Sequence, residues 1–177
     1  MTTAVAPTVA HPRDGRPAPA WAVRVAHLIP LLTLPSGLWR IALVAGVPLG
    51  LSEHSASLRP GLGERVYIVS LSLVAEALAL LALGLVRPWG EVFPRRLPLL
   101  GGRRVPPSFA VTVATAGAVA LILIWGYAAW GGAVRGGDLG FTPSGLVLLL
   151  ACYSPLLLWG PLLLVLTLAY HRRRCRD

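Results

Sequence analysis

Four long apolar runs, separated by short polar segments, dominate the chain after its first 24 residues. Each run reaches or exceeds the roughly 20 residues that a helix needs to cross about 30 Å of hydrocarbon. In each run, apolar residues lie on all sides of the predicted helix instead of forming one stripe. This pattern is typical of a helix that is surrounded by lipid or fully buried in protein. The pattern predicts an all-α fold, a transmembrane bundle of four helices over residues 21–171, with spans at about 25–51, 66–86, 108–130 and 145–170.

Two short polar segments flank this domain. Residues 1–20 are rich in Ala, Pro and Thr, which predicts a disordered cytoplasmic segment, and residues 172–177 form a basic cytoplasmic tail. The first apolar run is too long for the hydrophobic core of a signal peptide, which has about 7–15 residues. We therefore interpret it as a membrane span.

The composition agrees with the pattern, because the 177 residues are 55% hydrophobic and only 13% charged. A soluble domain carries about a quarter charged residues. Polar groups are too few to cover a globule, so lipid is the expected solvent for most of the surface. The sequence predicts a multi-pass protein of the cell membrane, in contact with membrane lipids.

The basic residues are sixteen Arg and no Lys, and their distribution predicts the orientation. Membrane proteins concentrate basic residues on the cytoplasmic side. The side of the N-terminal segment, the loop at 87–104 and the tail carries twelve arginines, whereas the other side carries Arg59, Arg65 and Arg135. Both termini are therefore predicted to be cytoplasmic. The alternation of the arginines also supports an even number of spans.

Arg40 lies inside the first apolar run, and the only other charge inside a run is Glu76 in the second. An arginine at the centre of a span costs about 2.5–3.5 kcal/mol on insertion scales and needs a partner. Counted from Leu51 and Arg65, both residues are eleven positions into the membrane, about 16 Å deep. We predict an intramembrane ion pair, which either fixes the register of two helices or forms an ion or substrate site.

Pro35 removes one helical hydrogen bond close to Arg40 and exposes polar backbone. A broken helix of this kind is the usual setting of binding sites near the middle of the membrane. Side chains at similar depth are candidates to line a cavity there: Ser36, Trp39, Ser72, Ser154 and Trp159. The alternative for the two tryptophans is plain packing. Prolines at positions 155 and 161 predict kinks in the fourth span.

Ala42, Gly46 and Gly50 repeat at a spacing of four residues. Small residues at this spacing let two membrane helices approach closely. The ridge is predicted to contact another helix of the bundle or a second copy of the chain, so the partners left open include a homo-oligomer or another membrane protein.

The loop at 87–104 alternates basic residues, prolines and apolar residues. We predict that it lies on the lipid headgroups, with contacts to lipid phosphates from Arg95, Arg96, Arg103 and Arg104. The alternative is a docking site for a cytoplasmic partner.

Catalytic and metal chemistry find no support. The sequence has no G-x-S-x-G motif, its two cysteines lie far apart, and its four histidines are scattered. We predict no catalytic residues, no metal and no cofactor. Nucleic-acid binding is not expected, because the arginines lie in short segments between spans instead of on one folded face.

Three phrases, at 35–40, 87–106 and 153–161, resemble a group of small four-span membrane proteins of actinobacteria. The resemblance implies the fold and no particular activity. The sequence as a whole favours a non-enzymatic accessory or small transport component of the cell membrane. The alternative is a transporter or lipid-handling enzyme that uses Arg40 and Glu76 directly.

Overall fold

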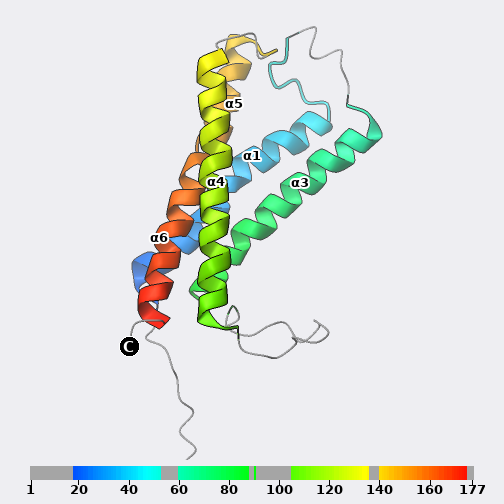
Figure 1. Ribbon diagram of the computed structural model, residues 1–177. Helices are drawn as coiled ribbons and strands as arrows, with labels where there is room; N and C mark the ends of the chain where they lie inside the picture. The colour runs from blue at the N-terminus through cyan, green and yellow to red at the C-terminus, as the bar shows by residue number, and fades with distance from the viewer. Residues whose placement is uncertain (1–17, 53–59, 88–89, 91–104, 136–139, 175–177) are drawn as a thin grey trace, which may run out of the picture.

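The computed structural model describes residues 18–52, 60–87, 90, 105–135 and 140–174, and most of these residues lie in helices (Figure 1). Four helical segments are long and apolar enough to cross a membrane, at Ala20–Val44, Leu62–Leu85, Pro107–Val134 and Pro143–Arg174. The predicted all-α fold with four candidate membrane spans is therefore confirmed. The individual elements are α1 (Ala20–Val44), α3 (Leu62–Leu81), the 3₁₀ helix η1 (Ala82–Leu85), α4 (Pro107–Arg135), α5 (Pro143–Tyr153) and α6 (Leu156–Arg174).

Successive spans run in opposite directions, so the bundle has two distinct ends (Figure 1). At the terminus end, α1 begins, η1 ends, α4 begins and α6 ends. At the hairpin end, α1 ends, α3 begins, α4 ends and α5 begins.

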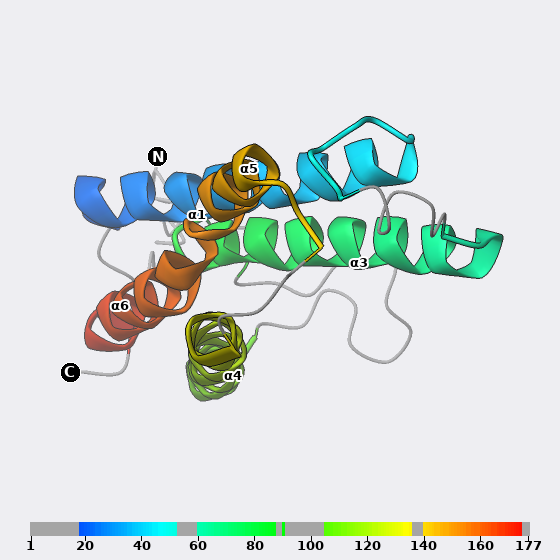
Figure 2. The ribbon, with the colours of Figure 1, turned by 90° about the horizontal axis from the view of Figure 1, so that it is seen from above.

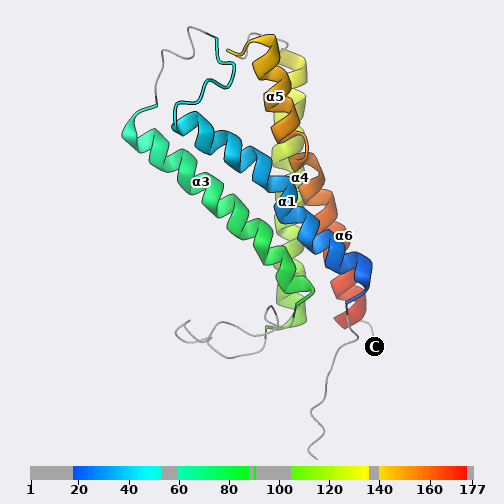
Figure 3. The same cartoon turned by 180° about the vertical axis from the view of Figure 1, so that it is seen from behind.

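The helices pack in two pairs, α1 with α3 and α4 with α6, and α1 also contacts α5 and α6. Seen along the bundle, α1 and α3 lie side by side while α4 stands apart from α3 (Figure 2). The view from behind shows the same tilt of α1 and α3 relative to α4 (Figure 3). Because α1 and α6 form the link between the two pairs, α3 and α4 are left with outward faces.

The core runs along the line where α1, α3 and α6 meet. Its most buried members are small residues of α1, α3 and η1 and larger ones of α1 and α6, namely Ala22, Ala26, Ile29, Ala79, Ala82, Leu156, Trp159 and Leu166. Most large apolar side chains lie outside this core; Leu123 of α4, for example, is 65% exposed. An apolar exterior of this extent fits contact with lipid and not with water.

Helix α1 ends at Val44 instead of continuing to Leu51 as predicted. Gly46 adopts a left-handed conformation (φ 81°), its N–H donates to the carbonyl of Leu43, and the N–H of Val47 donates to the carbonyl of Ala42. This pattern is a Schellman motif, in which glycine terminates a helix. The predicted small-residue ridge is thus wrong beyond Ala42, because its glycines form the helix end and the following turn.

The segment that follows α1 contacts the residues that precede α5. Leu51 forms an isolated antiparallel bridge with Phe141, and the N–H of Thr142 donates to the carbonyl of Gly50 over 2.8 Å. Thr142 then caps α5, since its hydroxyl accepts from the N–H of Gly145. The hairpin end is therefore held by backbone contacts between residues far apart in the sequence.

The fourth span consists of two helices. Helix α5 ends at Tyr153 and α6 begins at Leu156, so the break lies at Ser154 and Pro155, where proline cannot continue the ladder of hydrogen bonds. Pro161 lies inside α6. Where a kink was predicted at Pro155, the helix is interrupted over two residues, Ser154 and Pro155.

Candidate functional site

Arg40 lies near the hairpin end of α1, one helical turn before Val44. At about 1.5 Å per residue, it is about 6 Å from the end of the helix. Its side chain is buried, and Nε donates a hydrogen bond of 3.0 Å to the hydroxyl of Tyr153. The guanidinium carbon also lies 5.4 Å from the centroid of the Tyr153 ring. Tyr153 thus offers the cation both an acceptor and an aromatic face.

An aromatic cluster joins three elements beside Arg40. Trp39 of α1 meets Tyr153 edge-on at a centroid distance of 5.5 Å, and Trp125 of α4 meets the same ring at 6.0 Å. Phe141 lies 6.0 Å from Trp39. The cluster, made of Trp39, Trp125, Phe141 and Tyr153, fixes the position of Tyr153 as the partner of Arg40.

Glu76 lies well inside α3 and meets Thr33 of α1. The Thr33 hydroxyl oxygen is 2.7 Å from Glu76 Oε2 and 2.8 Å from the carbonyl oxygen of Pro30. Ser36, one turn further, donates to the carbonyl of Thr33 over 2.8 Å. Thr33 and Ser36 are both buried. We call Pro30, Thr33, Ser36 and Glu76 the Glu76 cluster.

Arg40 and Glu76 therefore have different partners, and no ion pair joins the two among the described residues. The predicted depth of Arg40 was counted from Leu51, whereas α1 ends at Val44. With this earlier end, Thr33 lies opposite Glu76. Arg40 lies two helical turns, about 10 Å, closer to the hairpin end.

The serines predicted to line a cavity lie elsewhere. Ser36 belongs to the Glu76 cluster, and Ser72, also buried, donates to the carbonyl of Ile68 in its own helix over 2.9 Å. Ser154 is exposed at the break between α5 and α6. Of the five predicted lining residues, Trp159 borders a cavity between α3, η1, α4 and α6, whereas Trp39 belongs to the aromatic cluster.

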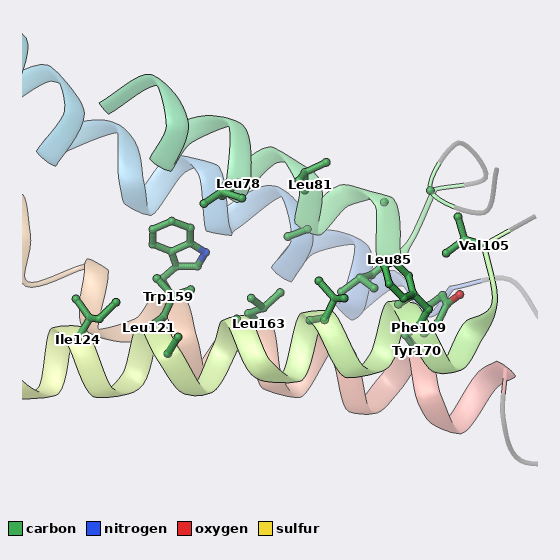
Figure 4. A pocket seen from close by; sticks show the side chains of 18 residues that line it. Leu78, Leu81, Leu85, Val105, Phe109, Leu121, Ile124, Trp159, Leu163 and Tyr170 are labelled. Atoms are coloured by element: carbon green, nitrogen blue, oxygen red, sulfur yellow. The ribbon is translucent and has the colours of Figure 1, made fainter. Parts of the chain in front are cut away.

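A cavity of about 550 Å³ lies between α3, η1, α4 and α6 (Figure 4). We call it the apolar groove. Its side chains are almost all hydrocarbon, and the larger ones are Leu78, Leu81, Leu85, Phe109, Val113, Leu121, Ile124, Trp159, Leu163 and Tyr170. This groove could not be predicted from the sequence, because its lining comes from three spans that are apolar on every side.

Small residues on α4 account for the hollow. Ala110, Ala114 and Gly117 border the groove, and a spacing of three or four residues places them on one helix face. A Cβ added at Gly117 would meet no atom within 4 Å. The groove is therefore space that short side chains leave open between α4 and α3.

The two ends of the groove differ in chemistry. The indole of Trp159 lies toward the hairpin end and Tyr170 toward the terminus end (Figure 4). The buried Nε1 of Trp159 has no hydrogen-bond partner among the described residues. Arg173 contacts two lining residues, since its NH2 group donates to the carbonyl of Leu85 over 2.9 Å and its guanidinium carbon is 5.6 Å from the ring centroid of Tyr170.

Arg173 also borders a second cavity of about 380 Å³ at the terminus end, together with Arg172, Trp21 and apolar residues of α6. Arg173 thus borders the second cavity and contacts two residues that line the apolar groove. The four arginines predicted to contact lipid phosphates, Arg95, Arg96, Arg103 and Arg104, lie outside the described residues.

Within the described ranges, no group of three or more His, Cys, Asp or Glu side chains is arranged to hold a metal ion. His27 instead lies near the terminus end, where its Nδ1 is 2.7 Å from the carbonyl of Val23 and its Nε2 is 3.4 Å from Arg87. The polar chemistry of the described spans is concentrated in the Glu76 cluster and at Arg40.

The sequence matches no family model, and neither a curated protein nor a solved structure shows significant similarity to it. The resemblance to small four-span proteins of actinobacteria stays a prediction.

Proposed function

We propose that this chain is an integral protein of the cell membrane that binds an anionic phospholipid, with one acyl chain in the apolar groove and the headgroup beside Arg173. The observation that carries the proposal is the groove itself, an apolar cavity that opens between two candidate membrane spans and ends near basic residues.

The size and lining of the groove fit a hydrocarbon chain. Its volume of about 550 Å³ lies within the range of about 300–1,000 Å³ that is usual for small-molecule sites. An empty hollow of this size would lose the dispersion contacts of every atom that lines it. In a bilayer, the molecules at hand to restore those contacts are lipid chains.

The charge at the terminus end favours an anionic headgroup over a neutral one. Arg172 and Arg173 border the second cavity, and Arg173 also lies against Tyr170 and Leu85 of the groove. A guanidinium group binds phosphate through paired N–H donors. Basic residues beside a cytoplasmic leaflet also attract anionic lipids at about 1 kcal/mol each.

Binding of an anionic phospholipid would suit a non-enzymatic accessory protein or a small transport component of the membrane. A second candidate is a transporter that uses Glu76 directly, because an acid well inside a span is typical of transport pathways. Glu76 contacts Thr33, which lies between the two prolines of α1. The two candidates use different parts of the molecule, since Glu76 does not border the groove.

Gly117→Leu tests the acyl-chain site. The added side chain enters open space in the groove, so the fold is expected to tolerate it, and a helix gains about 0.8–1.0 kcal/mol when glycine is replaced by a good helix former. We expect the variant to lose most of the phospholipid that copurifies with the wild-type protein in lipid nanodiscs, measured by mass spectrometry.

Gly126→Leu is the matched control, because Gly126 lies on the same helix, also has open space around it, and does not border the groove. It should keep the wild-type amount of lipid. Equal retention by both variants would exclude the groove as the binding site.

Arg173→Gln tests the headgroup preference, with Arg173→Lys as the variant that keeps the charge. We expect the glutamine variant to lose the preference for phosphatidylglycerol over phosphatidylcholine, and the lysine variant to keep part of it. A preference unchanged in both variants would contradict the placement of the headgroup at Arg173.

The proposed orientation places the terminus end in the cytoplasm, supported by the distribution of arginines in the sequence. In a cysteine-free background, His171→Cys should react with a membrane-impermeant maleimide only after the cells are opened. Gly61→Cys, at the start of α3, should react in intact cells. Both positions are exposed, so labelling from the same side would reject the orientation.

A further inference from the structure

The hydroxyl group of Thr33 has two acceptors within reach and only one hydrogen. Its oxygen lies 2.8 Å from the carbonyl oxygen of Pro30 and 2.7 Å from Oε2 of Glu76. Both are ordinary hydrogen-bond distances, and a hydroxyl can donate once and accept twice. The carbonyl can only accept. If the Thr33 hydrogen goes to Pro30, the contact with Glu76 requires a hydrogen on the carboxyl group.

We infer that Glu76 binds a proton in the folded protein and donates it to the oxygen of Thr33, which makes the Glu76 cluster a proton-binding site inside a membrane span. The hydrogen bonds then run in one direction, from the Glu76 carboxyl through the Thr33 hydroxyl to the Pro30 carbonyl. Each close contact has its own hydrogen. This inference does not depend on lipid binding in the apolar groove.

The charged neighbours of Glu76 support a neutral acid. On α1, the helix packed against α3, the candidates are Arg24, His27 and Arg40, and none of them forms an ion pair with Glu76 among the described residues. Arg40 is bound to Tyr153 and His27 lies beside Arg87 at the terminus end.

The remaining helices bring no cation to this depth either. On α3 itself, Glu64, Arg65 and Tyr67 lie within its first two turns. Helix α4 has no charged residue before Arg135, and the basic residues of α6 begin at His171, in its last turn. Within the described helices, a carboxylate at position 76 would therefore have no opposite charge beside it.

Hydrogen bonding leads to the same result. An ionised carboxylate offers about four acceptor sites, whereas the described residues provide a single hydroxyl, that of Thr33. No water is present in hydrocarbon to satisfy the rest. A proton on Glu76 removes the charge and turns an unsatisfied acceptor into a donor with a partner at 2.7 Å.

Release of the proton has a defined structural consequence. The Thr33 hydroxyl would have to turn its hydrogen from Pro30 to the new carboxylate. The Pro30 carbonyl would lose that donor, next to a helix section where Pro35 already leaves the carbonyl of Leu31 without its usual one. The site thus has two hydrogen-bond arrangements, one for each protonation state.

Infrared spectroscopy of the protein in lipid vesicles tests the inference, because a protonated carboxyl group has a C=O stretching band that a carboxylate lacks. We expect the spectrum of the wild-type protein minus that of Glu76→Gln, at neutral pH, to show this band. Glutamine keeps the shape of the side chain and can donate to Thr33, so the variant should fold. A difference spectrum with carboxylate bands alone would overturn the inference.

Two variants test the role of Thr33. Thr33→Ala removes the acceptor, so the band should move to higher frequency, whereas Thr33→Ser should leave it in place. Ser72→Ala is the control, because the Ser72 hydroxyl donates to Ile68 and not to Glu76. A band that is unmoved in Thr33→Ala would overturn the assignment of Thr33 as the acceptor.

Discussion

Gly160 of α6 lies directly against Ala118 of α4, so that a Cβ at position 160 would stand 2.9 Å from the carbonyl oxygen of Ala118. It would also lie 2.6 Å from Cγ1 of Ile122. Ala118 is completely buried. The two helices thus meet almost backbone to backbone, which small residues allow in membranes.

Gly160→Ala should therefore destabilise the protein. The Ile122 side chain can move, but the backbone oxygen of Ala118 cannot do so without a shift of the helix. Overpacking of this kind typically costs about 1–3 kcal/mol. The free energy of unfolding in mixed micelles of detergent and SDS measures the effect. Gly131→Ala, in α4 with no atom within 4 Å of the added Cβ, should be neutral or stabilising. Equal stability of both variants would contradict the close contact.

Tyr153→Phe should destabilise the hairpin end. The change removes the acceptor of Arg40 Nε but keeps the ring beneath the guanidinium group. An unsatisfied buried donor costs about 1–3 kcal/mol. Tyr67→Phe, at an exposed tyrosine of α3, serves as the control and should have no effect on the same unfolding measurement. If Tyr153→Phe lowered the free energy of unfolding no more than the control does, the Tyr153 hydroxyl would not stabilise Arg40.

Arg40→Gln and Glu76→Gln should have additive effects on stability. The two side chains bind Tyr153 and Thr33 respectively, and mutations about 7–10 Å or more apart usually add within about 0.3–0.5 kcal/mol. A double-mutant cycle of unfolding free energies measures the coupling. Arg40→Gln combined with Tyr153→Phe should show clear coupling. Strong coupling between Arg40 and Glu76 would restore the ion pair expected from the sequence.

Gly46→Ala should weaken the end of α1. Gly46 has φ 81°, a conformation that costs other residues about 1–2 kcal/mol. Gly37→Ala lies within the same helix, and its Cβ would meet no atom within 4 Å. It should stabilise by up to about 1 kcal/mol. In thermal unfolding, we expect the melting temperature to fall in Gly46→Ala and to rise in Gly37→Ala. A change in the same direction in both variants would contradict a helix end at Gly46.

The spans could be predicted from the sequence because each depends on a continuous run of apolar residues. The end of the first span was missed because Leu49 and Leu51 continue the apolar run beyond the helix. Gly46 followed by Pro48 is a typical signal for a helix end, and the left-handed conformation of Gly46 shows that the chain turns there. Because the helix end was predicted too late, the predicted depth of Arg40 was too great. This led to the prediction of an ion pair with Glu76.

The hydrogen-bond partners of Arg40 and Glu76 could not be predicted from the sequence either, for a physical reason. Thr33 and Tyr153 are ordinary residues of apolar spans until a neighbouring helix brings a charge to them. Trp159 was a candidate because of its size and depth, and it does border the apolar groove. The groove itself depends on the angle between α3 and α4, which no single span determines.

The packing of α4 has a consequence for the order of synthesis. Helices α1 and α3 contact each other and can associate as soon as both have been made. Helix α4 packs chiefly on α6, which leaves the ribosome after it. During translation, the third span must therefore wait in the bilayer, or beside the insertion machinery, until the fourth span arrives. The apolar groove is completed only at that moment.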